Sequence, residues 1–550
     1  MKKDGLVLVL TIIILCAAAA AVAAAGALAE PSGTGGVVEA FFMTGSEKTV
    51  SSCFVKRQEY AQALIDKKKR DFDPSTIRFE GNIVPFDSKT DTVYIPQDCG
   101  SASWTGSLSC EVPYTGIYIL DSNGIDKQKC IEEGSAFKTA LVSGDSYMEC
   151  DLVFTGLPAV CMQSRKDRAE IGKEYSGMIC VLDPYREEYQ EAVCSFHIRG
   201  ATSTLFDKKS YRVELTETTS KSDKYSFLGL RTDDDWILNS MCTDKSLARE
   251  KICYDLWERL NAMEKQPVAS SKIEYCELFL NNEYMGVYGL MYPVDRKLME
   301  MQPGDLLYKV NTWYEEMEIA GCLTDHNGKN EIYNKNGTVY LEIKYPKGIK
   351  NACIYDPFEL YQDMVFETGD LTEMRKAGIS LNMDNFILHE LFCEMTRAGD
   401  NTWKNMFIAA YRNNSGGYTL SETIWDLNYS FGDRFTWDPD NGNTVFLEDS
   451  VNEYKLRYDR DYGYNTLVKA VAGLREDTAS KWSEWRSEGI SPEYVNALFE
   501  KERDYLKSSG AFERNADRWS GPDPEAAYSG IGEWIRGRFL FMDKMYSYED

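Results

Sequence analysis

The stretch from Gly399 to Asp433 reads GDNTWKNMFIAAYRNNSGGYTLSETIWDLNYSFGD. MFIAAYR (406–412) and YTLSETIWDL (418–427) have the apolar and β-branched content of strands, and NNSGG between them has the residues of a tight turn. The stretch is therefore predicted to be a β-hairpin. Since a hairpin returns the chain to its start, Asn405 before the first strand and Asp426 near the end of the second are expected to lie close together.

The segment before the hairpin adds a second carboxylate. NMDNFILHELFCEMTRAGD is predicted to be a helix that ends at Gly399, which leaves Asp400 in the adjoining loop. Two carboxylates and an amide oxygen at one end of a hairpin suit a hard cation such as Mg²⁺ or Mn²⁺. Asp400 and Asn405 also have the D-x4-N spacing of a phosphoryl-transfer site, where one Asp orients the attacking hydroxyl while Asn and a second Asp hold metal.

Spacing alone leaves a structural alternative open for these three residues. Asp400 would then cap a turn, Asn405 would bond the hairpin backbone, and Asp426 would pair with an arginine.

The composition indicates a large globular protein that repels polyanions. With 43% hydrophobic and 13% aromatic residues, the 550-residue chain can fill several packed cores. Its 87 acidic side chains outnumber the 61 basic ones, and the formal charge of −26 disfavours nucleic acid as a partner. The longest basic run, KKKR at 67–70, is typical of a solvated helix face. We therefore expect no nucleic-acid partner.

The N-terminus predicts export. Lys2 and Lys3 precede a nearly unbroken apolar run from Gly5 to Ala29, which is long enough to span roughly 30 Å of hydrocarbon. Residues 1–29 are predicted to be either a cleaved signal peptide, for which Ala27-Leu28-Ala29 has the form of a cleavage site, or a single membrane anchor. The rest of the chain is expected to be extracellular or at the cell surface, in contact with the membrane only through an uncleaved segment.

Cysteine and histidine usage bears on disulfides and on metal binding. Of fifteen cysteines one, Cys16, lies in the apolar run, and the even number of fourteen that remains favours disulfides in an exported chain. The best candidates are those of the N-terminal third: Cys53, Cys99, Cys110, Cys130, Cys150, Cys161, Cys180 and Cys194. A chain with no CxxC pair and three histidines argues against a zinc site, and His389 within FILHELF is predicted to be a buried helix residue.

The remaining pattern predicts an α+β fold. Residues 30–36 have the Gly, Ser and Pro content of a linker, and residues 37–150 carry short strands such as TVYIP and GIYIL, as in a β-rich N-terminal module. From residue 151 extended runs alternate with helical ones, including a helix over 244–263 that Asp244 is expected to cap. The last hundred residues are predicted to be mostly helical.

Several ordered motifs carry a family resemblance over about residues 150–545. They are HIRGATSTLFDKKSYRVELTE (197–217), FLGLRTDDDWILNSMCTDKSLAREKICYDLWERL (227–260), ELFLNNEYMGVYGLMYPVDRKLM (277–299), LLYKV (306–310), KNMFIA, and WDLNYSFG. Together they resemble the CotH family of secreted, spore-coat-type atypical protein kinases. The resemblance implies a divergent kinase-like fold over residues 151–545, with a helical C-terminal region, that transfers the γ-phosphoryl group of ATP to Ser or Thr of partner proteins with a divalent metal.

The resemblance also implies roles for particular residues. Asp426 resembles the metal-binding acid, Asn405 its partner, and Asp400 the acid that orients the acceptor hydroxyl. RGATST (199–204) resembles the family's loop before a strand. Either Lys209 or Lys309 would be the phosphate-contacting lysine, and Arg199 and Arg249 are further candidates for contact with an anionic ligand.

Two positions depart from the family pattern. Tyr292 stands where members commonly have a Glu that would pair with the kinase lysine, and Asn428 stands where WDLD or WDFD is frequent. Asp295 or Glu277 would be the substitutes for the missing carboxylate. The expected function is therefore an exported CotH-like kinase, with a catalytically inactive surface or coat-assembly scaffold as the alternative.

Overall fold

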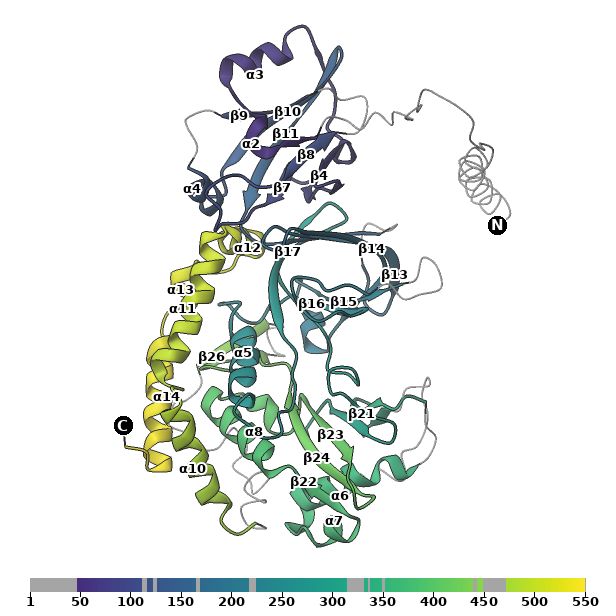
Figure 1. The fold of residues 1–550 in the computed structure, drawn as a ribbon, viewed down its shortest axis with the longest axis vertical. Helices are drawn as coiled ribbons and strands as arrows, with labels where there is room; N and C mark the ends of the chain where they lie inside the picture. The colour runs from purple at the N-terminus through teal and green to yellow at the C-terminus, as the bar shows by residue number, and fades with distance from the viewer. Residues whose placement is uncertain are drawn as a thin grey trace, which may run out of the picture. The chain divides into compact units, whose positions relative to one another are not determined.

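The computed structural model describes residues 47–110, 116–121, 126–164, 169–216, 224–313, 331–334, 337–348, 352–438, 443–448 and 471–549. These residues combine helices with sheets, so the predicted α+β class is confirmed (Figure 1). The apolar run of residues 5–29 lies outside them, as do the linker and the predicted signal or anchor. In the part of the chain that is described, no helix is both long enough and apolar enough to cross a membrane.

The first eleven strands form two sheets. A four-stranded sheet has the order β1 (Lys48–Thr49), β8 (Ser107–Cys110), β4 (Ile77–Phe79), β5 (Asn82–Ile83). A seven-stranded sheet has the order β2 (Phe54–Lys56), β9 (Gly116–Asp121), β10 (Ala136–Ser143), β11 (Ser146–Thr155), β7 (Thr92–Pro96), β6 (Phe86–Asp87), with β3 (Lys68–Lys69) on β11. Three short helices accompany them: α2 (Val50–Cys53), α3 (Arg57–Leu64) and α4 (Lys127–Glu132).

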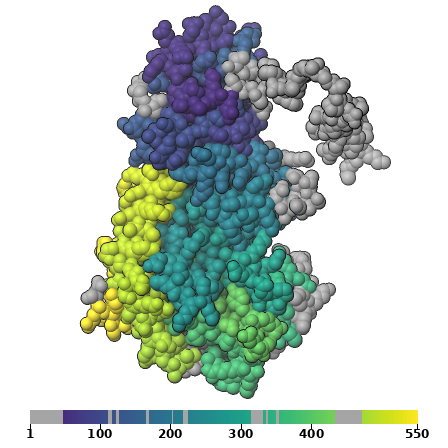
Figure 2. All heavy atoms as spheres, viewed as in Figure 1, coloured from purple at the N-terminus to yellow at the C-terminus, as the bar shows by residue number. Residues whose placement is uncertain are grey.

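These sheets share a core with the next part of the chain. Their apolar side chains pack together with Phe279 and Tyr284, and Tyr94 stacks on Tyr284 with a centroid separation of 5.5 Å. In Figure 2 the purple N-terminal residues lie directly against the blue and teal residues that follow. The two regions therefore belong to one compact unit, Gly45–Asp550.

A closed barrel of seven strands follows. Its order is β12 (Ala159–Ser164), β13 (Glu174–Asp183), β14 (Glu188–Arg199), β15 (Ser210–Leu215), β16 (Asp235–Asn239), β18 (Tyr284–Met291), β17 (Ile273–Leu280). The alternation in EAVCSFHIR sends Phe196 and Ile198 into the barrel core and leaves Arg199, at the end of β14, on the other face. Helix α5 (Arg249–Asn261) packs beside the barrel.

The predicted hairpin lies in a six-stranded sheet. The order is β20 (Glu331–Tyr333), β21 (Val339–Tyr345), β19 (Leu306–Val310), β23 (Met406–Arg412), β24 (Tyr418–Ile424), β22 (Ile379–Leu381). Helices α6 (Asp356–Asp363), α7 (Thr372–Lys376) and α8 (Met383–Thr396) pack with it, and a two-stranded ribbon, β25 (Asp433–Asp438) and β26 (Asn443–Glu448), follows. The hairpin is thus confirmed, although its second strand ends two residues before Asp426.

The C-terminal region is helical, as predicted. Its described helices are α10 (Leu474–Ser487), α11 (Pro492–Ser508), α12 (Ala511–Trp519), α13 (Pro524–Tyr528) and α14 (Ile531–Tyr546). Ser491 caps α11 by accepting a hydrogen bond from the Tyr494 N–H. Helix α14 docks on α8, where Arg538 donates to the Glu394 carboxylate at 2.5 Å. The yellow helices run beside one another in Figure 1.

One predicted helix start is wrong. Helix α5 begins at Arg249 rather than near Asp244. Asp244 lies in a preceding turn, where its carboxylate accepts hydrogen bonds from the N–H groups of Ser246 (2.9 Å) and Arg249 (2.8 Å). The carboxylate satisfies free N–H groups as a cap would, but it does so across a longer loop.

The expected disulfides are not found. The eight candidates of the N-terminal third are all free thiols. Cys161 and Cys180 are register partners on β12 and β13. Cross-strand Cβ atoms lie about 4.5–5.5 Å apart, whereas disulfides typically need about 3.8 Å. Facing positions on neighbouring strands are therefore not sufficient for a disulfide.

Candidate functional site

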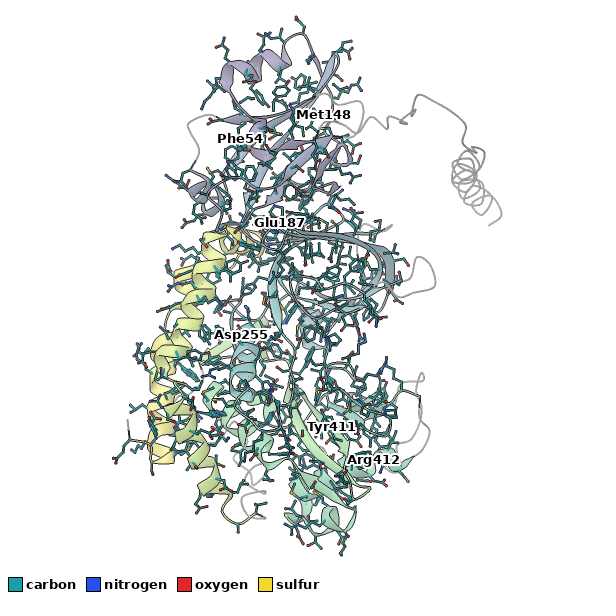
Figure 3. The ribbon with its side chains drawn as sticks, in the orientation of Figure 1. Phe54, Met148, Glu187, Asp255, Tyr411 and Arg412 are labelled. Atoms are coloured by element: carbon teal, nitrogen blue, oxygen red, sulfur yellow. The ribbon has the colours of Figure 1, made fainter. Side chains whose placement is uncertain are left out.

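The hairpin presents Asn405 and Asp426 together. Met406 pairs with Ile424, so Asn405 and Asp426 lie just beyond the last paired residues of β23 and β24. Both have positive φ, 55° and 61°, a left-handed conformation that Asn and Asp adopt more readily than most residues. Tyr411 and Arg412 mark the opposite end of β23 (Figure 3). The hairpin therefore collects the two predicted metal-binding side chains at one end.

A buried asparagine attaches the Asp400 turn to the same end. Helix α8 ends at Thr396, and Asp400 follows in a short 3₁₀ turn, Gly399–Thr402. The Asn401 side chain is 1% exposed; it accepts a hydrogen bond from the Trp425 N–H at 3.3 Å and donates to the Asp426 carbonyl at 3.5 Å. All three predicted oxygen-bearing residues thus lie on adjoining turns.

Asp400 is not isolated. Its carboxylate accepts a hydrogen bond from the Lys404 ammonium at 2.6 Å, and both side chains are about one-quarter exposed. A partly exposed pair of this kind is exchangeable, because its net contribution to stability is usually below about 1 kcal/mol. Asp400 can therefore leave Lys404 for another donor at little cost.

Two predicted cations meet over an aromatic surface beside these turns. The Arg199 guanidinium lies 5.7 Å from the centre of the Trp425 ring, and the Lys309 ammonium lies 5.9 Å from that of Phe407. The two rings contact each other edge to face, with centroids 5.8 Å apart. Arg199 from the barrel and Lys309 from β19 are thereby brought together next to Asp426.

Neither cation has a hydrogen-bonding or ion-pair partner in the described residues. The pKa of Lys309 is lowered to about 8, mainly by burial. The charges of Lys344 and Arg199 add to this effect, whereas those of Glu342 and Asp426 oppose it. Burial likewise lowers the pKa of Arg199, against the opposing charges of Asp426 and Glu250. An anion beside such half-buried cations would favour their charged forms.

Sequence reasoning missed Glu250, a carboxylate whose charge acts on Arg199. It lies in the first turn of α5, is 5% exposed, and accepts a hydrogen bond from the Asn239 amide at 2.7 Å. Burial and the charge of Asp426 raise its pKa to about 8, and Arg199 counteracts this. The available signal was its place in DKSLARE, one residue after Arg249, which the resemblance had already singled out.

The donor set suits a divalent cation. In the described part of the chain the side chains of Asn405 and Asp426 make no hydrogen bond or ion pair, so a carboxylate and an amide oxygen are unengaged. Asp426 is exposed. Glu250 adds a second carboxyl group, and the negative charge of Asp426 disfavours its ionised form. Hard cations take such oxygen ligands and relieve the repulsion. No group of three or more His, Cys, Asp or Glu side chains among the described residues is arranged for metal, so ligand oxygens would have to complete the shell.

Lys209 and Arg249 lie outside this arrangement. The Lys209 ammonium donates to the carbonyls of Thr204 (2.8 Å) and Phe206, and so fastens the loop that follows Arg199. Arg249 donates to Asp244 at 2.7 Å and to the Ser430 carbonyl at 3.1 Å, which ties the start of α5 to the chain after Asp426. Both residues therefore hold backbone segments next to the site in place.

The departures from the family pattern also have structural places. Tyr292 lies under Arg231, whose guanidinium is 4.3 Å from the ring centre, and Arg231 also pairs with Asp295 at 3.0 Å. Glu277 is bound by Arg514 at 3.0 Å. None of these carboxylates is beside Arg199, where Glu250 stands instead. Asn428 donates to the Thr243 hydroxyl at 2.5 Å.

Comparison with known proteins identifies the family. A family model described as CotH kinase protein matches residues 196–542, more than half of the chain. The chain therefore belongs to the CotH kinase protein family, and the resemblance drawn from its motifs is confirmed. The match spans every residue of the candidate site, namely Arg199, Glu250, Lys309, Asp400, Asn405 and Asp426. A search of curated proteins found no match.

Proposed function

We propose that this member of the CotH kinase protein family transfers the γ-phosphoryl group of ATP to a Ser or Thr hydroxyl of a partner protein. The observation that carries the proposal is the pair of cations, Arg199 and Lys309, that lack an ion-pair partner in the described residues and lie next to Asp426. Such a pair suits a polyphosphate, because each added negative oxygen relieves the repulsion between the two side chains.

The residues divide the chemistry between them. Arg199 and Lys309 donate to phosphate oxygens and hold the chain of phosphates in place. Asp400 exchanges Lys404 for the acceptor hydroxyl, orients it and takes its proton as the new O–P bond forms and the bond to ADP breaks. Asp426 and Asn405 would hold Mg²⁺ or Mn²⁺, which when bound neutralises charge on the phosphates.

The finer features of the sequence analysis belong to the same proposal. The barrel with α5 and the sheet with α8 would be the two lobes of a divergent kinase-like fold, and residues 37–150 a β-rich accessory module. Lys2, Lys3 and the apolar run that follows support export through a signal peptide or retention by an anchor, with the site facing the extracellular space. The partner protein would then be an extracellular or coat protein.

One observation favours the alternative of a catalytically inactive scaffold. Asp400 already has a cationic partner, Lys404, at 2.6 Å. If that pair does not open, the fold would bind nucleotide without transferring phosphate, and the protein would act as a nucleotide-dependent binding partner in coat or surface assembly.

Two matched aspartate variants test the proposal. Asp426→Asn should weaken Mn²⁺-dependent ATP binding in calorimetric titration, because an anionic ligand becomes a neutral amide. Asp400→Asn should leave binding nearly unchanged and lower radiolabel transfer from ATP by about 10²–10⁴-fold, the scale of a positioned acid–base group.

The acceptor in this assay is a generic Ser/Thr protein or the chain itself. Binding without any transfer in the parent protein would favour the scaffold. If both variants bind and transfer like the parent, the assignment of these residues is wrong.

A further inference from the structure

A continuous chain of buried polar side chains runs beneath the candidate site. It starts at Tyr361 on α6, whose hydroxyl donates to Glu422 on β24 at 2.7 Å. The other carboxylate oxygen of Glu422 lies 3.1 Å from Nδ1 of His389 on α8, and Nε2 of His389 lies 3.8 Å from the Cys393 sulfur. All four residues are at most 5% exposed, so these hydrogen bonds are closed to solvent.

The chain ends on the turn that carries Asp400. The Cys393 sulfur lies 3.9 Å from the carbonyl oxygen of Asn401. The side chain of Asn401 is the one that bonds the backbone of Trp425 and Asp426. A change in the hydrogen bonding of Cys393 therefore affects Asn401, which joins the Asp400 and Asp426 turns.

Cys393 has one S–H and two acceptors within reach. If Nδ1–H of His389 donates to an ionised Glu422, Nε2 is an acceptor and takes the S–H. If Glu422 is protonated and donates to Nδ1, the imidazole carries its hydrogen on Nε2 and donates to the sulfur. The S–H is then released to the Asn401 carbonyl. The tautomer of His389 therefore decides which of the two acceptors receives the hydrogen bond from the Cys393 S–H.

We propose that His389 is a positioning residue for this site: through Cys393 it sets whether the Asn401 carbonyl receives a hydrogen bond, and thus how firmly the Asp400 turn is held beside Asp426. The inference rests on the proposed function only in so far as Asp400 and Asp426 act in transfer. The hydrogen-bond chain itself is independent of nucleotide.

The charges around the chain set the pH range in which the two arrangements exchange. Burial raises the pKa of Glu422 to about 7, which its bond from Tyr361 opposes, and burial lowers the pKa of His389 to about 4. Burial and the carboxylates of Glu390, Glu422 and Glu394 raise the pKa of Cys393, so its proton stays on sulfur.

The other groups that face the chain come from two further helices. Cys253 on α5 lies near Cys393, and the Trp257 ring on α5 is steeply inclined to the His389 ring, with ring centroids 6.1 Å apart. Arg538 on α14 neutralises Glu394. Glu390 on α8 is buried as well, and burial together with the charges of Glu394 and Glu422 raises its pKa well above the usual value. Among the members of the hydrogen-bond chain, the group that titrates near neutrality is Glu422, and His389 is uncharged on both sides of the transition.

The sign follows from these shifts. Below about pH 7 Glu422 is protonated, the S–H reaches Asn401, and the turn is held more firmly; above it, the bond is lost. An S–H···O bond is weak, about 0.5–1 kcal/mol. We therefore expect amide exchange of the turn to differ by roughly two- to fivefold between the two states.

Hydrogen exchange of the full chain, followed by mass spectrometry on peptides spanning 397–405 and 421–430, tests the proposal. After correction for intrinsic rates, exchange should be slower at pH 6 than at pH 8 in the parent protein. Glu422→Gln, whose amide donates to Nδ1 permanently, should be slow at both values. Cys393→Ala should be fast at both, while Cys276→Ala, an equally buried thiol in the barrel, should behave as the parent.

Tyr361→Phe provides a second variant that keeps the chain intact. It removes the hydrogen bond that favours ionised Glu422, so the midpoint of the exchange transition should move to higher pH. The proposal is overturned if Glu422→Gln retains the pH dependence of the parent, or if the Tyr361→Phe midpoint does not move. Loss of transfer in every protein with these exchange results intact would instead count against the proposed function.

Discussion

The candidate site and the contact between helix α12 and the barrel both hold buried charge, but they treat it in opposite ways. At the α12 contact, Arg514 makes two hydrogen bonds of 3.0 Å to Glu277 and one of 2.7 Å to Thr155. Tyr284 donates a further bond to Glu277 at 2.7 Å. At the candidate site, Arg199 and Lys309 make no such bonds with described residues.

The pKa shifts record the same difference. Burial acts to lower the pKa of Arg514, but the charge of Glu277 more than offsets it, so the pKa is raised. At the candidate site burial prevails, and the pKa values of Arg199 and Lys309 are lowered. A buried cation that is held by its own chain supports the fold. One that lacks such a partner is available to a ligand.

Breaking the α12 pair should have the largest effect on stability. Glu277→Gln leaves the Arg514 charge buried without its counter-ion, and loss of one partner of such a pair usually costs about 3–5 kcal/mol. Urea unfolding of the full chain at pH 7 measures this loss. A matched control is Glu283→Gln, since Glu283 pairs with Arg518 at 2.6 Å but is about one-third exposed. If both variants lose the same small amount, the contrast between the two regions fails.

Removing the Glu250 carboxylate from the candidate site should stabilise the fold rather than destabilise it. The pKa of Glu250 is raised to about 8 by burial and by Asp426, well above about 4.3 for a free Glu. A raised carboxyl pKa gives stability that is lost as pH rises toward 8. Glu250→Gln should therefore be nearly neutral at pH 5 and stabilising by at least about 1 kcal/mol at pH 9 without metal. Equal effects at the two pH values would contradict this.

Replacing the two cations should leave stability nearly unchanged. Arg199→Met and Lys309→Met exchange unpaired, half-buried charge for apolar volume over Trp425 and Phe407, and such exchanges are usually neutral or favourable. We expect changes within about 1 kcal/mol in urea unfolding. A loss as large as that of Glu277→Gln would mean that these cations support the fold as Arg514 does.

Sequence reasoning succeeded where the signal was local. The hairpin follows from two strand-like runs around NNSGG, and it brings Asn405 and Asp426 together as expected. The buried position of His389 was also read correctly from its apolar helix. These features depend on neighbours within a few dozen residues.

It failed where long-range packing decides. Glu250 reaches the site because α5 packs against strand β17 of the barrel and against helix α8. Tyr292 lies against the Arg231 guanidinium instead. The choice between Lys209 and Lys309 could not be made from sequence, because the difference lies in their partners. Lys209 donates to a carbonyl of its own loop. Lys309 lies over Phe407 because its strand, β19, pairs with β23, which is distant in the sequence.

Arg199 and Lys309 are proposed to bind the phosphates of a nucleotide. Thermal unfolding of the full chain with Mn²⁺ and ATP tests this proposal most directly, with the Arg199→Met, Lys309→Met double variant beside the parent. ATP at a hundred times its dissociation constant should stabilise the parent by about 2.7 kcal/mol, seen as a raised melting temperature. The double variant, which should melt near the parent without ligand, should show no rise. If ATP does not raise the melting temperature of the parent, or raises that of both proteins equally, Arg199 and Lys309 do not bind the phosphates.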